Sequence, residues 1–242
     1  MTRSSRLFLF CFYLPILTFI ALFSNHTNAS DPPIEFSAEY NLLHNNAQIG
    51  KVTLAVKKVA GDQYKLTSST KTGSLAKLLG ARDSTETSLF EHKNGQIRPL
   101  TYQYKDGKKN TELTFNWASS RVTNYSEKPT EVRLLQPGVL DGALMKIALM
   151  QDLNDATNKI TYHSTDGGRF KAYSFTQLGK ENINLTSGTY ETIKVVRQKE
   201  KKKELMYYWF AKELHMLPVM ITREKSFGSF KMTLSKVDFP NE

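Results

Sequence analysis

Residues 112–117 read Glu-Leu-Thr-Phe-Asn-Trp, and this stretch decides the fold class. Apolar Leu113, Phe115 and Trp117 alternate with polar residues, which is the period of a β-strand with one buried face and one wet face. The same alternation recurs at Phe36–Leu42, Val52–Val56, Tyr64–Leu66, Leu100–Tyr104, Ile193–Val195, Leu217–Ile221 and Phe230–Leu234. A chain built of such segments is predicted to form a sheet whose two faces differ in polarity.

Turn sequences rich in glycine separate these runs. They are Gly61-Asp62, Asn94-Gly95, Asp106-Gly107, Asp166-Gly167-Gly168 and Ser187-Gly188. Such residues accept positive φ and close hairpins, so consecutive strands are expected to pair with each other. The sequence lacks a repeated strand–helix–strand rhythm, which argues against a doubly wound fold.

Two segments are predicted to be helical. Ser74–Leu79 gives one or two turns, with Ser74 as the N-cap and Gly80 as the stop. Asp141–Leu153 is longer, with Asp141 as its N-cap, and it is apolar around most of its girth. Such a helix must be buried on most sides, and we expect it to lie across the mouth or the concave side of the sheet.

One predicted strand, Leu205–Ala211, is apolar at successive positions. A strand of this kind is covered on both faces, and the helix at Asp141–Leu153 is the natural second cover. We therefore predict a mainly β fold: a single antiparallel, strongly curved sheet or open barrel of roughly ten to twelve strands, with one medium helix packed on it.

The first thirty residues have the layout of a secretory leader. Arg3 and Arg6 precede an uncharged apolar run, Leu7–Phe23, and the small residues Thr27 and Ala29 follow a short polar stretch. This pattern predicts export to the periplasm of a Gram-negative cell and cleavage after Ala29.

Cleavage divides the chain into a signal peptide, residues 1–29, and a single β-rich domain, residues 30–242. The alternative is an inner-membrane anchor formed by residues 7–23, because seventeen apolar residues approach the length of a spanning helix.

The composition of the mature chain excludes several kinds of chemistry. Its only cysteine, Cys11, leaves with the leader, so disulfides, thiol catalysis and thiolate-bound zinc are excluded. Loss of Arg3 and Arg6 lowers the formal charge from +10 to +8. A basic exported protein can meet anionic membrane surfaces, although lysines also simply solvate the outer face of a sheet. Nucleic acid is not an expected partner, because export separates the protein from it.

No motif in the sequence predicts catalysis, a metal or a cofactor. The four histidines of the mature chain lie far apart; they are His44, His92, His163 and His215. The chain has no zinc-binding, nucleophile-elbow or phosphate-loop signature. The carboxylates that flank the predicted helix or begin a strand form no spaced pair; they are Asp83, Glu86, Asp141, Asp152 and Asp155. We predict no catalytic residue, and a non-enzymatic role is favoured over an enzyme with a dispersed site.

The large aromatic side chains support one functional hypothesis. In strands such residues usually pack in the core, but a short helix leaves part of a curved sheet uncovered. We predict an apolar gap that takes the acyl chain of a lipid or a similar envelope molecule; its lining residues are Phe115, Trp117, Leu144, Met145, Tyr207 and Trp209. The alternative is a structural or interaction module that docks on an envelope protein.

An ordered set of short motifs resembles a known family. The motifs are Ile49-Gly50, Gly95-x-x-x-Pro99-x-x-Tyr102, Phe115-Asn116, Leu140-Asp141, Gly188-x-Tyr190-x-Thr192, Trp209-x-Ala211 and Leu217-Pro218-Val219. Their order resembles the bacterial envelope family catalogued as domain of unknown function 3108, over roughly residues 36–238. The resemblance implies an exported, β-rich domain with no established activity and no catalytic residue to carry over. The sequence after Leu140-Asp141 departs from the family pattern, which puts any shared site at that helix in doubt.

Overall fold

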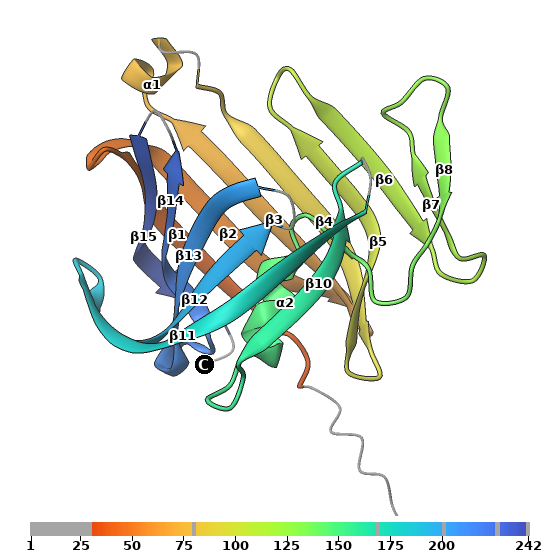
Figure 1. Cartoon of the computed structure of the whole chain (residues 1–242). Coiled ribbons are helices and arrows are strands. Elements are labelled where there is room, and N and C mark those ends of the chain that lie inside the picture. The colour runs from red at the N-terminus through yellow and green to blue at the C-terminus, as the bar shows by residue number, and fades with distance from the viewer. Residues whose placement is uncertain (1–30, 79–80, 168–169, 200–201, 226–227, 241–242) are drawn as a thin grey trace, which may run out of the picture.

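Fifteen strands of the described residues form one large sheet. The computed structural model describes residues 31–78, 81–167, 170–199, 202–225 and 228–240. In this part of the chain the strands lie in the order β8-β7-β6-β5-β4-β3-β2-β1-β15-β14-β13-β12-β11-β10-β9 (Figure 1). Their bounds are β1 Phe36–His44, β2 Ala47–Ala60, β3 Gln63–Thr72, β4 Ser84–Lys93, β5 Gln96–Lys105, β6 Asn110–Asn116, β7 Arg121–Asn124, β8 Glu131–Leu134, β9 Leu140–Asp141, β10 Lys159–Thr165, β11 Lys171–Leu185, β12 Gly188–Lys199, β13 Lys202–Ala211, β14 Leu217–Lys225 and β15 Gly228–Asp238.

The helices are α1 (Ser74–Leu78), α2 (Met145–Asp152) and a short 3-10 turn at Lys212–Leu214. Neither α-helix in the described part of the chain has the length and hydropathy that crossing a membrane requires. The predicted cleavage after Ala29 and the alternative anchor at residues 7–23 fall on residues 1–30, which lie outside the described residues.

The mainly β prediction is confirmed, and two of its details are corrected. The described sheet has more strands than the ten to twelve expected, because β7, β8 and β9 have only four, four and two residues and are too short to show a sustained alternation in the sequence. The sheet is also mixed, since β9 pairs with β10 in parallel, through Leu140 with Ser164 and Asp141 with Thr165. Helix α2 connects these two strands, and a helical crossover returns the chain in its original direction.

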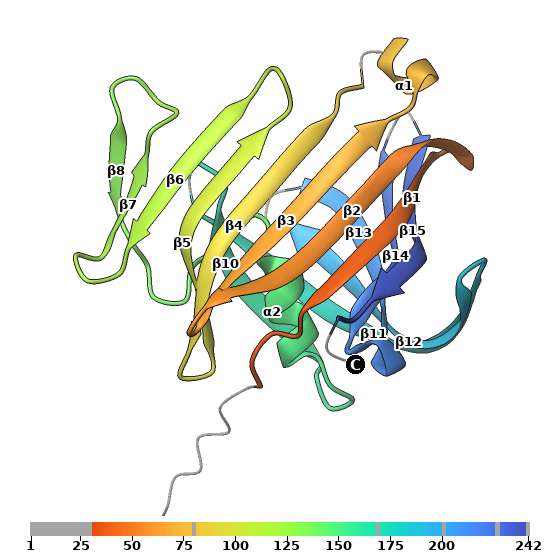
Figure 2. The same cartoon turned by 180° about the vertical axis from the view of Figure 1, so that it is seen from behind.

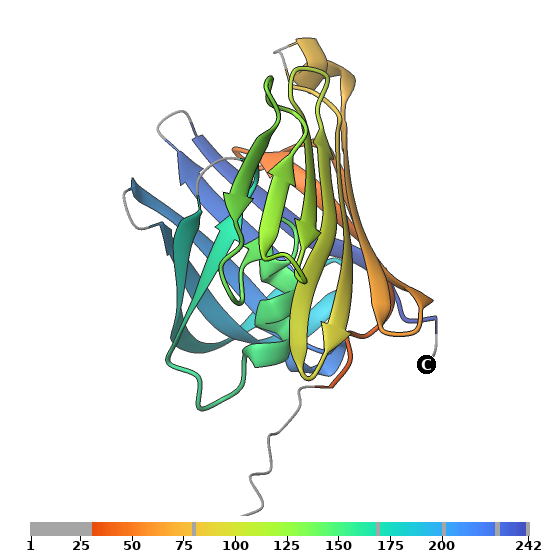
Figure 3. The same ribbon diagram turned by 90° about the vertical axis from the view of Figure 1, so that its right-hand side faces the viewer.

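The sheet curls around α2 without closing. Strands β2–β5 and β10–β14 form two walls with α2 between them (Figure 3), and β1–β5 lie in front of the C-terminal strands in Figure 2. The two end strands, β8 and β9, do not pair with each other. Instead, Ser88 of β4 donates a hydrogen bond to Asp141 of β9 at 2.5 Å. Asn124 of β7 likewise donates to the Gly167 carbonyl, just after β10, at 2.6 Å. The ends of the sheet therefore overlap.

Helix α2 is shorter than predicted and begins later. Its residues run from Met145, and Asp141 belongs to β9. The N-cap residue is Leu144, whose side chain makes no capping bond. Asp141 instead accepts hydrogen bonds from the backbone N–H groups of Ala143 and Leu144, at 2.9 and 3.0 Å, and so stabilises the turn that leads into the helix. The expected wide burial is observed, and the buried helix residues are Met145, Ile147, Ala148, Leu149 and Met150.

On the concave face, the strand registers align side chains in rows that cross several strands. One row runs from β12 to β1 and is apolar; it consists of Val195, Tyr208, Ile221, Met232 and Leu42. Below it, Phe210 pairs with Ile193, and Tyr40 pairs with Leu234; all four are buried in the same core as α2. Burial of these rows and of the helix supplies the hydrophobic stabilisation of a chain that lacks disulfides.

Two buried tyrosines of this core allow a matched test. The Tyr40 hydroxyl is buried, and among the described residues it has no hydrogen-bond partner. The Tyr102 hydroxyl, in contrast, donates a hydrogen bond to Glu86 at 2.7 Å. An unsatisfied buried hydroxyl costs free energy, and a satisfied one contributes about 1 kcal/mol.

We therefore expect Tyr40→Phe to leave the free energy of unfolding unchanged or raise it by about 1 kcal/mol, and Tyr102→Phe to lower it by about 1–2 kcal/mol. Urea unfolding of the two variants beside the native protein measures this. An equal loss of unfolding free energy in both variants would contradict the assignment of Tyr40 as the hydroxyl without a partner.

Candidate functional site

The six residues predicted to line an apolar gap come from three regions of the fold: the end of β6, the entry to α2, and β13. Leu144 and Met145 are buried at the start of α2, and Phe115 is buried on β6, all in the main core. Tyr207 and Trp209 lie on the opposite face of β13 from Tyr208, because successive side chains of a strand alternate. Phe115, Leu144, Met145 and Trp209 nevertheless belong to one hydrophobic core cluster, against which Trp117 and Tyr207 pack. Ligand binding by these six residues stays a prediction.

The outer face of β13 is covered by polar side chains of neighbouring strands, not by α2. The Lys194 ammonium lies 4.9 Å from the ring centroid of Trp209 and 5.8 Å from that of Tyr207. The Trp209 indole N–H donates to Glu181, which also pairs with Lys194 at 3.3 Å. The expectation that both faces of this strand are covered holds at Trp209, but the cover differs from the predicted one.

Two cavities flank α2 at the end of the sheet where residues 31–35 enter. One, of about 490 Å³, is lined by Trp117, with Arg98, Leu140, Ala148 and Tyr162 among the other residues. The Arg98 guanidinium covers the Trp117 ring at 5.5 Å, and the indole N–H donates to the Pro99 carbonyl. The other, of about 550 Å³, lies between residues 31–36, α2 and the turn at His215 and Met216. Both have polar side chains in their walls, and Gln151 of α2 lines each of them.

A third cavity combines an apolar wall with cations. It has a volume of about 210 Å³ and lies on the concave face of β13, β14, β15 and β1. Its lining residues are Leu42, Met206, Ile221, Thr222, Arg223, Lys225, Phe230, Lys231 and Met232. Leu42, Ile221 and Met232 belong to the apolar row that also contains Tyr208. The cavity therefore opens directly above the core.

The next row of side chains outward from the core carries two arginines. The registers place Arg197, Met206, Arg223, Phe230 and His44 side by side across β12 to β1. The Arg197 guanidinium lies 5.2 Å from the Tyr173 ring, and the Lys225 ammonium lies 5.6 Å from the Phe230 ring. Aromatic faces attract such cations and fix their positions.

Tyr208 belongs to the apolar row, and its hydroxyl reaches Met206 in the row that carries the arginines. Burial raises the pKa of its hydroxyl, and the positive charges of Arg197 and Arg223 oppose that rise. Both guanidinium groups are therefore close to the same hydroxyl. The Tyr208 hydroxyl donates to the Met206 sulfur at 3.2 Å, which is a weak acceptor.

Sequence reasoning missed Arg197 and Arg223, although the sequence carries a signal for both. Arg197 continues the alternation of Ile193 and Val195, and Arg223 continues that of Val219 and Ile221. A cation at the next position of an apolar face is unusual, because burying an ionised group costs free energy unless it is compensated. That pattern marks the end of the core and the start of a charged rim.

Acidic side chains, not arginines, lie where β9 meets β4. Asp141 is completely buried, and burial raises the pKa of its carboxyl group to about 7. The hydrogen bond from Ser88 works against this rise, and the negative charge of Glu86 adds to it. Gly142 permits this crowding, because a Cβ atom there would lie 3.3 Å from the Tyr102 hydroxyl oxygen. The described residues include no group of three or more His, Cys, Asp or Glu side chains that could hold a metal ion.

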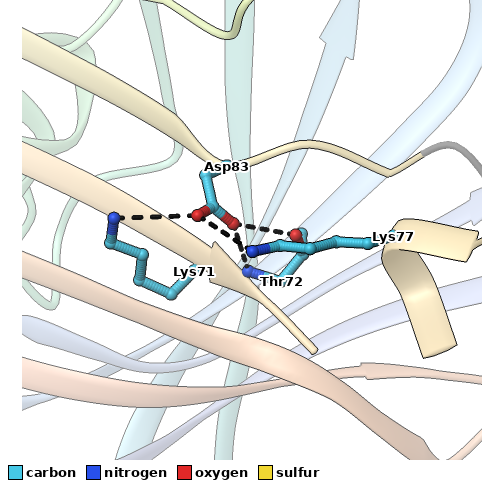
Figure 4. Close-up of polar contacts among 4 residues, drawn as sticks. All are labelled: Lys71, Thr72, Lys77 and Asp83. Carbon is cyan, nitrogen blue, oxygen red and sulfur yellow. Dashed lines mark hydrogen bonds and ion pairs between the residues drawn. The ribbon is translucent and has the colours of Figure 1, made fainter. Parts of the chain in front are cut away.

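A carboxylate also fixes α1 beside the hairpin ends. Asp83 accepts hydrogen bonds from both the backbone N–H and the hydroxyl of Thr72, each at 2.8 Å (Figure 4). Lys77 of α1 pairs with it at 3.3 Å and Lys71 at 3.7 Å. The N–H of Thr72, above all, holds the pKa of Asp83 well below its usual range. This contact is structural, since the carboxylate is already committed to the segment that it anchors.

The shifted pKa of Asp141 predicts a pH dependence of stability. A carboxyl group with a raised pKa in the folded state stabilises the fold fully below its unfolded pKa, near 4, and loses that contribution as the pH rises through about 7. Asp141→Asn cannot titrate and keeps the same hydrogen-bond partners. We expect the difference in unfolding free energy between the variant and the native protein to shift in favour of the variant by up to about 4 kcal/mol from pH 4 to pH 8.

Urea titrations at several pH values measure this difference. Asp155→Asn is the control, because Lys212 and Lys180 lower the pKa of that exposed carboxylate. Any change of its stability difference with pH should therefore have the opposite sign to that of Asp141→Asn. A difference for Asp141→Asn that does not change with pH would show that Asp141 does not titrate in this range.

The fold and the site define a class of β-barrel-like proteins with an open sheet wrapped around one helix. The chain belongs to the family described as protein of unknown function DUF3108, whose model matches residues 35–235. The resemblance expected from the motifs is thereby confirmed. Among curated proteins, no sequence matches this chain.

Two solved structures are similar to the chain. One is a β-barrel-like protein of domain of unknown function DUF1849 from Brucella abortus, with a TM-score of 0.57 at 10% sequence identity, over 88% of this chain and 100% of that chain. Another is a candidate exported protein with a YmcC-like fold from Bacteroides fragilis, with a TM-score of 0.34 at 10% identity, over 86% of this chain and 98% of that chain. The first likeness shows the fold alone, and the second is too distant to support an argument.

Proposed function

We propose that this protein is a non-catalytic carrier or sensor of an apolar or amphipathic molecule of the cell envelope, such as a lipid. Its leader-like N-terminus supports a place in the periplasm. The observation that carries the proposal is the cavity of about 210 Å³ above the core, with Leu42, Ile221 and Met232 in its wall. Leu42 and Met232 are partly exposed there, and covering such surface contributes about 25 cal/mol per Å².

The size and chemistry of this cavity suit part of a flexible chain. Its volume of about 210 Å³ is well above the minimum that holds a single water. Met206 and Met232 contribute unbranched thioethers, which adapt to ligands of different shape. A molecule with an aliphatic segment can therefore lie along the wall with its end toward α2.

A second candidate is an interaction module, and one observation favours it. Strand β8 ends the sheet, so one of its edges has no neighbouring strand in the described sheet. Its side chains Val132 and Leu134 are 52% and 77% exposed. An open edge with apolar side chains is a surface on which an envelope protein can add a strand. An enzyme has less support, because Asp141 and Glu86 both bond to neighbours that hold the fold together.

Filling the cavity tests the carrier. Leu42 lines it, whereas Leu43 points to the other face of β1, and both side chains are partly buried. We expect the native protein to bind the uncharged fluorescent probe N-phenyl-1-naphthylamine saturably. The affinity should fall about tenfold or more in Leu42→Trp, because the indole occupies the space, and stay unchanged in Leu43→Trp.

Thermal unfolding of both variants shows whether the fold is intact. Absence of saturable probe binding by the native protein, or equal binding by the two variants, would reject the cavity as a ligand site. The interaction module would then be the better account.

A further inference from the structure

The two arginines above the cavity lie in one register row with a single strand between them. Met206 of β13 pairs with Arg197 on one side and with Arg223 on the other. Neighbouring strands are about 4.8 Å apart, so the two Cα atoms are separated by roughly 10 Å. Arginine side chains are long enough to meet over that span. A single oxyanion above Met206 can therefore contact both guanidinium groups once Arg197 moves from the Tyr173 ring on β11, against which it lies at 5.2 Å.

The surroundings of this point favour an anion. Tyr208 is close to both guanidinium groups, and its hydroxyl is bonded only weakly, to the Met206 sulfur. A rotation of that hydrogen toward an anionic oxygen would give a stronger bond. Lys225 lies on the same face, one pair further out, at the rim of the cavity. Glu224 alternates to the opposite face of β14, away from the row.

The polarity of the wall changes abruptly along the strands. The row at Tyr208 is apolar, whereas the row at Met206 has an arginine on each side of Met206. A ligand that satisfies both rows has an aliphatic tail directed toward α2 and a charged group about one residue pair further out. Guanidinium groups bind carboxylate and phosphate with paired, charge-assisted hydrogen bonds.

We propose that the molecule bound in this cavity is an anionic amphiphile, whose carboxylate or phosphate head group is held by Arg197 and Arg223 and whose aliphatic tail lies on Ile221, Met232 and Leu42. This inference rests on the proposed carrier function. It adds the charge of the ligand, the residues that select it and the direction in which it lies.

The test compares probes with the same twelve-carbon chain and different heads. Dodecanoate, dodecyl phosphate, dodecyl maltoside and dodecyltrimethylammonium are each used below their micellar concentrations, and displacement of N-phenyl-1-naphthylamine reports their affinity. We expect the native protein to bind at least one of the two anions about tenfold more tightly than the neutral and cationic probes. The stronger of the two anions identifies a fatty acid or a phospholipid-like head as the source.

Arg197→Gln and Arg223→Gln should each reduce that preference about fivefold or more while N-phenyl-1-naphthylamine still binds. Arg98→Gln removes the same charge at the distant Trp117 cavity and is the matched control. Arg223→Lys keeps the charge and should retain part of the preference. Thermal unfolding shows that each variant is folded.

The outcomes separate the two proposals. Equal affinity for all four heads, or unchanged preference in both glutamine variants, would overturn the anionic site and leave the carrier intact. Loss of preference in Arg98→Gln to the same degree would reduce the effect to net charge and would also overturn it. Failure of every probe to bind would reject the carrier function itself.

Discussion

The side chain of Asp141 joins the entry to α2, the β9 end of the sheet and the interior strand β4. Its carboxyl group accepts the Ser88 hydroxyl on β4 and two backbone N–H groups at the entry to α2, while its backbone pairs with β10. A curled sheet whose edges do not pair needs some such contact to fix how far they overlap. Because the group is fully buried and its partners already orient it, the position of α2 inside the curl follows from it.

The size of α2 then decides what remains uncovered. A helix of eight residues is about 12 Å long, whereas fifteen strands at 4.8 Å spacing extend over more than about 60 Å before the sheet curls. The helix fills the end of the curl where residues 31–35 enter. Toward the other end of the curl, no helix of the described residues covers the concave face. There the apolar row at Tyr208 is followed by a row that contains Arg197 and Arg223. The cavity at Leu42 and Met232 lies at that transition.

Much of this architecture was predictable because it depends on local periodicity. Alternation in Leu113–Trp117 and its repeats gave the strands, and glycine turns gave the hairpins. The parallel pair of β9 with β10 was not predictable, since two residues carry no period and their pairing depends on the path of α2. The helix start was misplaced for a related reason: Asp141 has the chemistry of an N-cap, but it caps the preceding turn.

The site was harder to predict, because it depends on which strands lie side by side. Tyr207 and Trp209 were predicted to face a ligand; the structure places the Lys194 ammonium over both rings and Glu181 on the Trp209 indole, contacts that no single-strand pattern shows. Arg197 and Arg223 are 26 positions apart in the sequence and meet only through Met206 of the strand between them. The single-strand pattern shows that each cation ends an apolar face. Only the order of the strands in the sheet shows that the two apolar faces end in the same row. A charged row directly above an apolar one is the arrangement that an amphiphile would need, and a hydrophobic core alone does not have it.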